Sequence, residues 1–298
     1  DSKTRKSNQA YSHEPKIYSY EFGTNIGHIA ILSIHQDAQS HGLLPKRSMR
    51  LPVENRNELI SLIELTNPDL KVVTYSKTPI WTEAPSAWRE TERFSIFWNG
   101  FRWVDQYEFL ESYFKAREVS KVKRTVQLNI GYLRDAKLAL RKLGLPEGVP
   151  HVSVHARDGL GGGIRRAQLF ESFYPSIDEL AKRGFWVLRI GTPEMPKIKK
   201  FRNLIDLTEK ELSWLHAHAL HEAAFHLGTN SGPSIMAQTF GTPTIVTNTT
   251  SIGRCTVTGS RGTFYLPKKV KLRERVLTLR ELLLHAEGYS ELDGNLLE

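Results

Sequence analysis

The sequence has 298 residues, 40% of them hydrophobic and 24% charged, a balance typical of a globular chain that can bury a core. A single cysteine, Cys255, excludes an internal disulfide framework and fits a reducing compartment. The formal net charge of +9 favours an anionic partner, either nucleic acid, an acidic membrane surface or a phosphorylated small molecule. No apolar run approaches the roughly 18 residues of a membrane-spanning helix, and no apolar segment follows the polar start, so neither a span nor a leader is expected.

The first half of the chain alternates short apolar runs with helical segments. We expect strands at residues 17–22, 49–53 and 71–75, with helices at 29–39 and 54–64 between them. The first strand and helix are joined by a glycine-containing turn. Because the first N–H groups of a helix lack partners within the helix, such a turn can bind an anion or a hydroxyl. The alternation predicts a first α/β layer.

Residues 79–103 carry four tryptophans interleaved with arginines. Such a segment can stack bases or sugars and hold phosphates. The alternative is that the tryptophans pack a loop-rich rim of the first domain. Helical segments at 106–121 and 130–143 follow, and they end at residues 144–148, where glycine and proline are typical of a helix stop and a linker. We therefore predict two domains, residues 1–148 and 149–298.

The second half repeats the alternation more strongly. Its strands are expected at 151–156, 185–190, 223–227 and 243–247, with helical segments at 167–182, 209–222 and up to residue 240. This order predicts βαβ units and a parallel sheet, in which ligands bind at the carboxyl ends of the strands. Residues 249–262 are expected to form a loop over that site. Near the end, Thr278 and Glu281 predict a capping box at the start of a helix that runs to residue 285.

Arg157 follows a strand that is expected to be buried, and it precedes a glycine-rich turn at 159–163. A guanidinium at this position can bind a diphosphate through two parallel charge-assisted hydrogen bonds. The alternative is an ion pair with Asp158 or a neighbouring carboxylate. Arg165 and Arg166 lie just beyond the turn, so all three arginines could converge on one polyanion.

The turn Gly228-Thr-Asn-Ser-Gly232 leads directly into a helix. Its N–H groups suit a phosphate or a ribose, as do the hydroxyls of Thr229, Ser231 and Ser234. In the same parallel sheet as Arg157, the turn predicts a binding site for a polyanion.

Other kinds of site are not predicted. The sequence contains neither Gly-x-Ser-x-Gly nor a Walker loop. His218 and His221 would share a helix face that excludes His216, and no carboxylate-rich partner is near, so no metal site is predicted. For His155, at the end of a core strand, a satisfied buried imidazole and a functional one are equal alternatives.

Four segments together resemble a bacterial family of glycosyltransferases. They are residues 155–158, 165–174, 187–191 and 227–234, where the family typically shows His-Val-Arg-Asp, Tyr-Arg-Asn, Val-Arg-Met-Gly and Gly-Thr-Thr-Ser-Gly. Residues 25–28 resemble the family's early Gly-His-Leu-Ala segment. More remotely, the His-x-Arg strand end is similar to the donor-diphosphate motif of fucosyltransferase-like enzymes. Two departures are the replacement of Tyr-Arg-Asn by Ile164-Arg165-Arg166 and His216 at a position where an acidic residue is expected.

The resemblance implies an α/β fold of the GT-B type, with two Rossmann-like domains whose parallel sheets face a cleft. The first domain would present the acceptor and the second would bind a nucleotide-sugar donor. The residues implied for the donor are Arg157, Arg165, Gly191, Thr229, Asn230, Ser231, Gly232 and Ser234. Those implied for the acceptor are Asn25, Gly27 and His28. Arg157 and His28 are the catalytic candidates; helix capping or a core position is the alternative for His28.

The resemblance also implies a reaction that needs neither a cofactor nor a metal. The negative charge of the leaving nucleoside diphosphate grows as the glycosidic bond breaks, and Arg157, Arg165 and the helix after residue 232 would stabilise it. We expect a nucleotide sugar and a glycan or lipid-linked acceptor as partners, and no nucleic acid. The expected setting is surface polysaccharide synthesis in the cytoplasm, with a peripheral contact to the acidic inner face of the membrane. The alternatives are a nucleotide-sugar epimerase or hydrolase and a basic nucleic-acid-binding protein.

Overall fold

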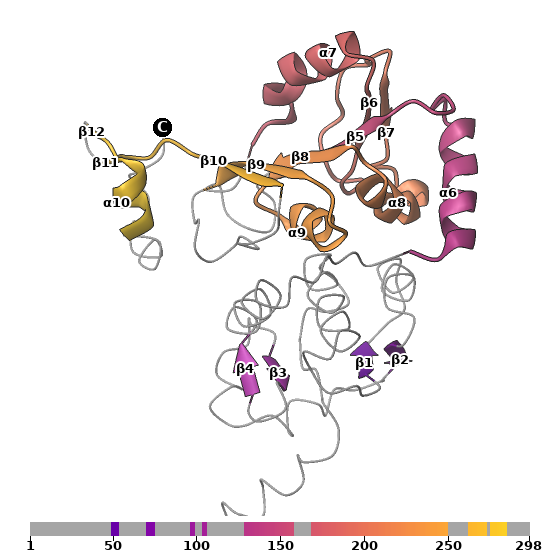
Figure 1. Ribbon diagram of the computed structural model, residues 1–298, viewed down its shortest axis with the longest axis horizontal. Helices are drawn as coiled ribbons and strands as arrows, with labels where there is room; N and C mark the ends of the chain where they lie inside the picture. Colours follow the sequence, from indigo (N-terminus) through magenta and orange to yellow (C-terminus); the bar gives the residue numbers. More distant parts are fainter. Residues whose placement is uncertain are drawn as a thin grey trace, which may run out of the picture. The chain divides into compact units, whose positions relative to one another are not determined.

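The computed structural model describes residues 49–53, 70–74, 96–98, 103–105, 128–157, 168–249, 262–272 and 275–284 (Figure 1). The chain divides into two compact units, Asp1–Lys123 and Arg124–Glu298. No helix among the described residues is long and apolar enough to cross a bilayer.

Four short strands of the first unit are described. β1 (Met49–Val53) and β2 (Leu70–Thr74) pair in parallel, which confirms the strands predicted at 49–53 and 71–75. β3 (Ile96–Trp98) and β4 (Trp103–Asp105) pair in antiparallel fashion. This pair lies inside the tryptophan- and arginine-rich segment, for which a loop-rich rim was one interpretation. The strand predicted at 17–22 and the helices predicted at 29–39, 54–64 and 106–121 lie outside the described residues.

The second unit is built on a six-stranded parallel sheet in the order β10-β9-β8-β5-β6-β7. Its strands are β5 (His151–His155), β6 (Trp186–Arg189), β7 (Leu204–Asp206), β8 (Phe225–Thr229), β9 (Thr244–Thr249) and β10 (Thr263–Pro267). Counted in chain order from β5, this is the strand order of a Rossmann sheet. The order reverses between β5 and β8, and a ligand of such a sheet binds beyond the carboxyl ends of those two strands. The parallel sheet is confirmed, and β7 is a strand that the sequence did not predict.

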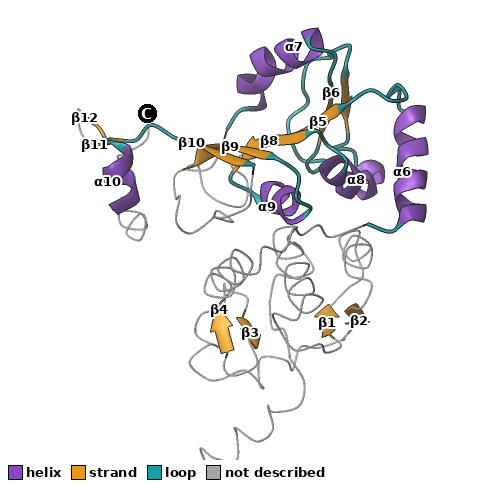
Figure 2. Cartoon of the chain, viewed as in Figure 1, coloured by secondary structure: helices purple, strands orange, loops and turns teal. Residues whose placement is uncertain are grey.

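Four of the described helices of the second unit pack around its sheet. They are α6 (Ile130–Lys142), α7 (Tyr174–Lys182), α8 (His216–His221) and α9 (Gly232–Thr239), with 3-10 turns η3 (Phe170–Phe173) and η4 (Lys210–Leu215) before α7 and α8. Figure 2 shows α7 on one side of the sheet and α8 and α9 on the other. Pro175 lies in the first turn of α7, where its missing N–H leaves no hydrogen bond unmade.

The two faces of β5 bury different side chains. Val152 and Val154 join the apolar cluster beneath α7, together with Phe173 and Ile177. The alternate residues point to the other face, because successive side chains of a strand alternate. These are His151, Ser153 and His155, which are also buried.

Helix α6 lies in the second compact unit, which begins at Arg124. The domain division after residue 148 stays a prediction. The Tyr132 hydroxyl donates a hydrogen bond to the Trp214 carbonyl, and the two rings meet edge to face. The helix ends at Lys142, one residue before the predicted end, and Gly144 lies just beyond it with a φ of +105°, in the region that favours glycine. The linker-like composition of 144–148 therefore marks a turn within the unit.

The end of the described chain forms a small separate element. β11 (Lys271–Leu272) and β12 (Arg275–Val276) pair in antiparallel fashion before α10 (Leu279–Leu284). The predicted capping box is confirmed. The Thr278 N–H donates to Glu281 Oε2 at 2.8 Å, and the Glu281 N–H donates to Thr278 Oγ1 at 3.3 Å.

Candidate functional site

Arg157 and residues 229–231 lie together at the switch point of the sheet. His155 and Gly228 are paired residues at the ends of β5 and β8, so the chain leaves both strands at the same level. The Arg157 N–H donates to Thr229 Oγ1 at 3.1 Å and fixes one strand end to the other. The Arg157 side chain is half-buried. The structure thus brings together the two segments that the sequence predicted to form one site.

Gln168 binds the carbonyl side of the Arg157 backbone, and no motif in the sequence predicts this contact. Its N–H donates to the Arg157 carbonyl at 2.8 Å. Its Oε1 lies 3.0 Å from the hydroxyl of Thr247, at the carboxyl end of β9, and that hydroxyl lies 3.2 Å from the Gly228 carbonyl. Gln168 therefore connects the ends of β5 and β9 and leaves the Arg157 backbone bonded at both its N–H and its carbonyl.

The three hydroxyls of the turn after β8 form hydrogen bonds inside the chain. Thr229 accepts from Arg157, while Ser231 and Ser234 both donate to the Thr229 carbonyl, at 3.1 and 2.6 Å. All three residues are buried. Ser231 is the N-cap residue of α9, yet its side chain caps none of the helix N–H groups. A ligand at this end of α9 would therefore meet backbone N–H groups rather than these hydroxyls.

Asn230 is the residue of this turn whose side chain most clearly indicates a ligand. It is only 3% exposed, and its Nδ2 is buried without a hydrogen-bond partner. Leaving a buried amide unsatisfied costs about 1–3 kcal/mol, so such groups are rare unless a ligand, water or ion completes them. An oxygen of a phosphate or a sugar would satisfy this amide.

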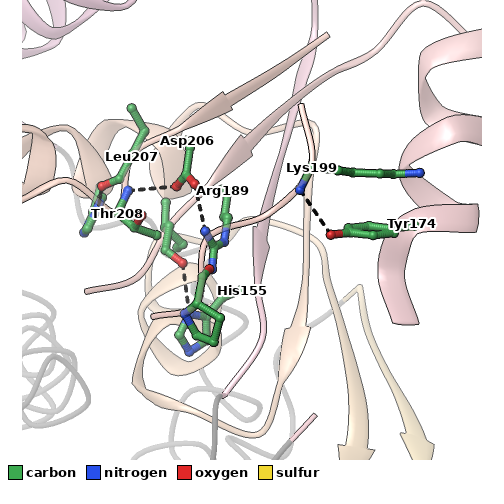
Figure 3. A network of polar contacts seen from close by, with 10 residues as sticks. His155, Tyr174, Arg189, Lys199, Asp206, Leu207 and Thr208 are labelled. Atoms are coloured by element: carbon green, nitrogen blue, oxygen red, sulfur yellow. Dashed lines mark hydrogen bonds and ion pairs between the residues drawn. The ribbon is translucent and has the colours of Figure 1, made fainter. Parts of the chain in front are cut away.

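The carboxyl end of β6 carries a buried arginine that serves the fold. Arg189 is 2% exposed; its Nη1 donates to Asp206 Oδ2 at 2.7 Å and its Nη2 to the Pro196 carbonyl at 2.8 Å (Figure 3). Its guanidinium also lies 4.7 Å from the centre of the Phe170 ring. The arginine of the Val-Leu-Arg-Ile-Gly segment thus connects β6, β7 and η3.

Gly191 follows this arginine and is half-buried. A Cβ at this position would collide with the Met195 sulfur and lie 3.2 Å from Thr208 Cγ2. Packing alone therefore explains this glycine. Its role in donor binding stays a prediction, as do those of Thr229, Ser231, Gly232 and Ser234.

Five of the described histidines of the second unit are buried, namely His151, His155, His216, His218 and His226. The His155 ring donates from Nδ1 to the Ile190 carbonyl at 3.1 Å, which favours the structural alternative for this residue (Figure 3). In α8, His216 donates to the Leu207 carbonyl and His218 stacks on His151. Among the described residues, no group of three His, Cys, Asp or Glu side chains could hold a metal ion.

Burial keeps several of these imidazoles neutral. Desolvation lowers the pKa of His151 and takes the pKa of His218 to about 4, with the neighbouring His151 adding to the second shift. The pKa of His226 falls to about 3, again chiefly through burial and then through His155. At neutral pH these rings are therefore uncharged.

Several predicted site residues lie outside the described part of the chain. They are Asn25, Gly27 and His28 on the acceptor side, and Arg165 and Arg166 beyond the glycine-rich turn.

No protein-family model matches the chain, and no curated protein sequence is significantly similar to it. Solved structures are similar, among them the ADP-heptose LPS heptosyltransferase II of E. coli. That match has a TM-score of 0.55 at 10% identity and covers 81% of this chain and 87% of the other. The E. coli heptosyltransferase WaaC with ADP matches with a TM-score of 0.50 at 14% identity, over 82% of this chain and 91% of the other. Together with the strand order, these likenesses show that the chain has an α/β fold of the GT-B type.

Proposed function

We propose that the chain is a glycosyltransferase that moves a sugar from a nucleotide-sugar donor to a glycan or lipid-linked acceptor without a metal. The observation that carries the proposal is the end of the sheet between β5 and β8. There Arg157, the N-terminus of α9 and the unpartnered amide of Asn230 lie at the switch point of a Rossmann sheet. A cation, a helix N-terminus and a buried amide donor together suit a diphosphate and the sugar or ribose beside it.

Each group has a distinct part in binding the donor. The Arg157 guanidinium would bind the diphosphate through parallel hydrogen bonds, with its backbone fixed by Thr229 and Gln168. The first N–H groups of α9 would bind a phosphate oxygen, since the Ser231 side chain does not cap them. The Asn230 amide would donate to a phosphate or ribose oxygen.

Sugar transfer then follows from charge stabilisation. The acceptor hydroxyl oxygen bonds to the anomeric carbon, the bond from that carbon to the diphosphate breaks, and the diphosphate leaves with the bonding electrons. Arg157, Arg165 and α9 stabilise the charge that develops on it. His28 accepts the proton of the acceptor hydroxyl, a task that suits an imidazole near neutral pH. The fixed positive groups take the place of a metal ion.

The similar structures suggest where to begin the search for a donor. One is named for ADP-heptose and the other holds ADP. We propose that ADP-sugars are tested first, and that the protein acts in the cytoplasm at the inner membrane face in surface polysaccharide synthesis.

The test combines a thermal-shift screen of nucleoside diphosphates and nucleotide sugars with product analysis. A ligand bound by the native site raises the unfolding temperature. Arg157→Ala should abolish the shift and most of the transfer, and Arg157→Lys should recover little, because lysine cannot form the parallel pair of hydrogen bonds. Arg183→Ala is the matched control, because Arg183 is an exposed arginine of the same unit that pairs with Glu179 on the surface.

The outcomes separate the alternatives. Transfer by Arg157→Ala at the native rate would contradict the proposal. Donor consumption without an acceptor, as the main reaction, would indicate a hydrolase or an epimerase. Loss of transfer in EDTA, restored by a divalent ion, would contradict the metal-free mechanism.

A further inference from the structure

A buried chain of hydrogen bonds runs from the centre of the sheet to the first turn of α9. The Ser153 hydroxyl in β5 lies 3.0 Å from Nδ1 of His226 in β8. The other ring nitrogen, Nε2, lies 3.1 Å from Ser234 Oγ in α9. The Ser234 hydroxyl lies 2.6 Å from the Thr229 carbonyl. Ser153, His226 and Ser234 are all at most 1% exposed.

The direction of these hydrogen bonds follows from the last of them. A carbonyl can only accept, so the single proton of the Ser234 hydroxyl goes to Thr229. Ser234 Oγ must then accept from His226 Nε2, which carries the ring proton. Nδ1 is left as the acceptor for the Ser153 hydroxyl. The ring therefore has one tautomer, and it stays neutral because its burial lowers its pKa to about 3.

Gly228 leaves the space that this ring occupies. A Cβ on Gly228 would lie 2.5 Å from His226 Nε2, 3.0 Å from Ser234 Oγ and 3.1 Å from the His155 carbonyl. The first of these separations is closer than real Cβ contacts allow, and the second is tighter than most of them. The first glycine of the turn 228–232 is thus required by the histidine two residues before it, because any side chain would push the ring away from Ser234.

We propose that His226 is a positioning residue that holds the first turn of α9 against the end of β8 through Ser234 and the Thr229 carbonyl. The turn so fixed carries Asn230 and the first N–H groups of α9, which the proposed function assigns to the donor diphosphate. The inference rests on the proposed function only for the identity of the ligand. The hydrogen bonds that hold the first turn of α9 are present in the protein without a ligand.

Two substitutions of His226 test the contacts of its two ring nitrogens one at a time. In His226→Gln the amide nitrogen can take the place of Nε2 and donate to Ser234, while the Ser153 contact is lost. In His226→Asn the amide oxygen can take the place of Nδ1 and accept from Ser153, but the side chain is too short to reach Ser234. Each variant loses one buried hydrogen bond, but asparagine is also one methylene group smaller than glutamine, so a pair of substitutions that keeps the ring must give the same ranking. Ser234→Ala and Ser153→Ala repeat the comparison without changing the histidine.

The first two measurements need no ligand. The ring ¹⁵N shifts of native His226 should show the proton on Nε2. The Ile235 amide, which donates to the Ser231 carbonyl in the first turn of α9, should exchange its hydrogen about tenfold faster in His226→Asn and Ser234→Ala than in His226→Gln and Ser153→Ala. A proton on Nδ1, or equal exchange in all four variants, would overturn the inference.

The third measurement is titration with ADP. We expect the affinity for ADP to be about tenfold weaker in His226→Asn than in His226→Gln. The reason is that only the asparagine variant loses the buried hydrogen bond to Ser234, and one such bond is worth about this factor. Equal affinity in the two variants, with ADP bound by the native protein, would overturn the positioning role. If the native protein binds no nucleoside diphosphate, the proposed function fails, while tautomer and exchange still decide whether His226 holds α9.

Discussion

The two faces of the sheet in the second unit bury opposite kinds of side chain. Under α7 the strands present Val152, Val154, Val187 and Leu227 to an apolar cluster. Under α8 and α9 the alternate positions of the central strands carry His151, Ser153 and His226, each with a hydrogen bond to another element. On the apolar face, the side chains must together fill the available volume. On the polar face, each buried donor and acceptor must also have a hydrogen-bond partner.

The difference explains where the candidate site lies. Apolar packing tolerates small adjustments if the volume is kept, whereas a buried hydrogen-bond chain has one arrangement that satisfies all its members. The helix that begins at the switch point, α9, lies on the polar face. The sheet thus uses its apolar face for stability and its polar face to fix the end of the helix that would bind a diphosphate.

The largest expected effect is on the apolar face. Phe173→Ala should lower the free energy of unfolding by about 3–5 kcal/mol, because a buried aromatic ring leaves a cavity. Urea unfolding measures this loss, and the ADP affinity of the folded protein should not change. Leu138→Ala, at a residue 48% exposed on α6, is the control and should stay within about 0.5 kcal/mol. A large loss of affinity in Phe173→Ala would show that the two faces are not separate.

Acid should act on the polar face. The pKa values of His218 and His226 are about 4 and 3 in the folded protein, below the ordinary value near 6.5, so the unfolded chain binds more protons between these limits. Stability is therefore complete above about pH 6.5 and falls as the pH is lowered toward 4. Each histidine contributes about 2 kcal/mol of this loss between pH 7 and pH 5. The urea midpoint across this range is the measurement, and His218→Gln should remove part of the slope; an unchanged midpoint would show that the rings are not buried as described.

Gly228→Ala tests the space on the polar face. The added methyl group must displace the His226 ring or Ser234, and we expect a loss of about 1–3 kcal/mol in unfolding free energy. ADP binding should weaken as in His226→Asn. The control is Gly131→Ala in α6, where the nearest atom to the added Cβ is the side-chain oxygen of Asn129 at 3.1 Å and the His226 chain is not touched. Normal ADP affinity in a folded Gly228→Ala protein would argue against the positioning role.

The smallest effect is expected at the connection between β9 and Gln168. Thr247→Val keeps the shape and removes the hydroxyl that bonds Gln168 Oε1, with an expected loss of about 1 kcal/mol. Thr247→Ser should restore the native midpoint. If valine were neutral in both stability and ADP affinity, Gln168 would have no measurable part in holding Arg157.

The sequence was sufficient to locate most of the fold of the second unit. Its strands alternate with helices at lengths that periodicity can recognise, and Arg157 and the turn 228–232 were predicted to share one sheet edge. β7 was missed because three residues are too few to show a period. The contact of Tyr132 in α6 with Trp214, which is far away in the sequence, could not be predicted from any local pattern.

The details of the candidate site could not be predicted, for a physical reason. From the sequence, the hydroxyls of Ser231 and Ser234 were predicted to suit a ligand. In the structure, both hydroxyls donate hydrogen bonds to the Thr229 carbonyl. Periodicity placed Gln168 in a helical segment and His226 in a strand, and it predicted no particular contact for either residue. Their partners lie 79 and 73 residues away in the sequence, and no local pattern carries such pairings.

The contact between His226 and Gly228 has a consequence for the evolution of this chain. A larger residue at position 228 is tolerable only if the ring at 226 is replaced by something smaller, and a histidine at 226 is useful only if 228 remains glycine. The two positions should therefore covary among homologous sequences. In homologues without the histidine, alanine at 228 would escape the 2.5 Å collision and meet only the tight contacts with Ser234 Oγ and the His155 carbonyl.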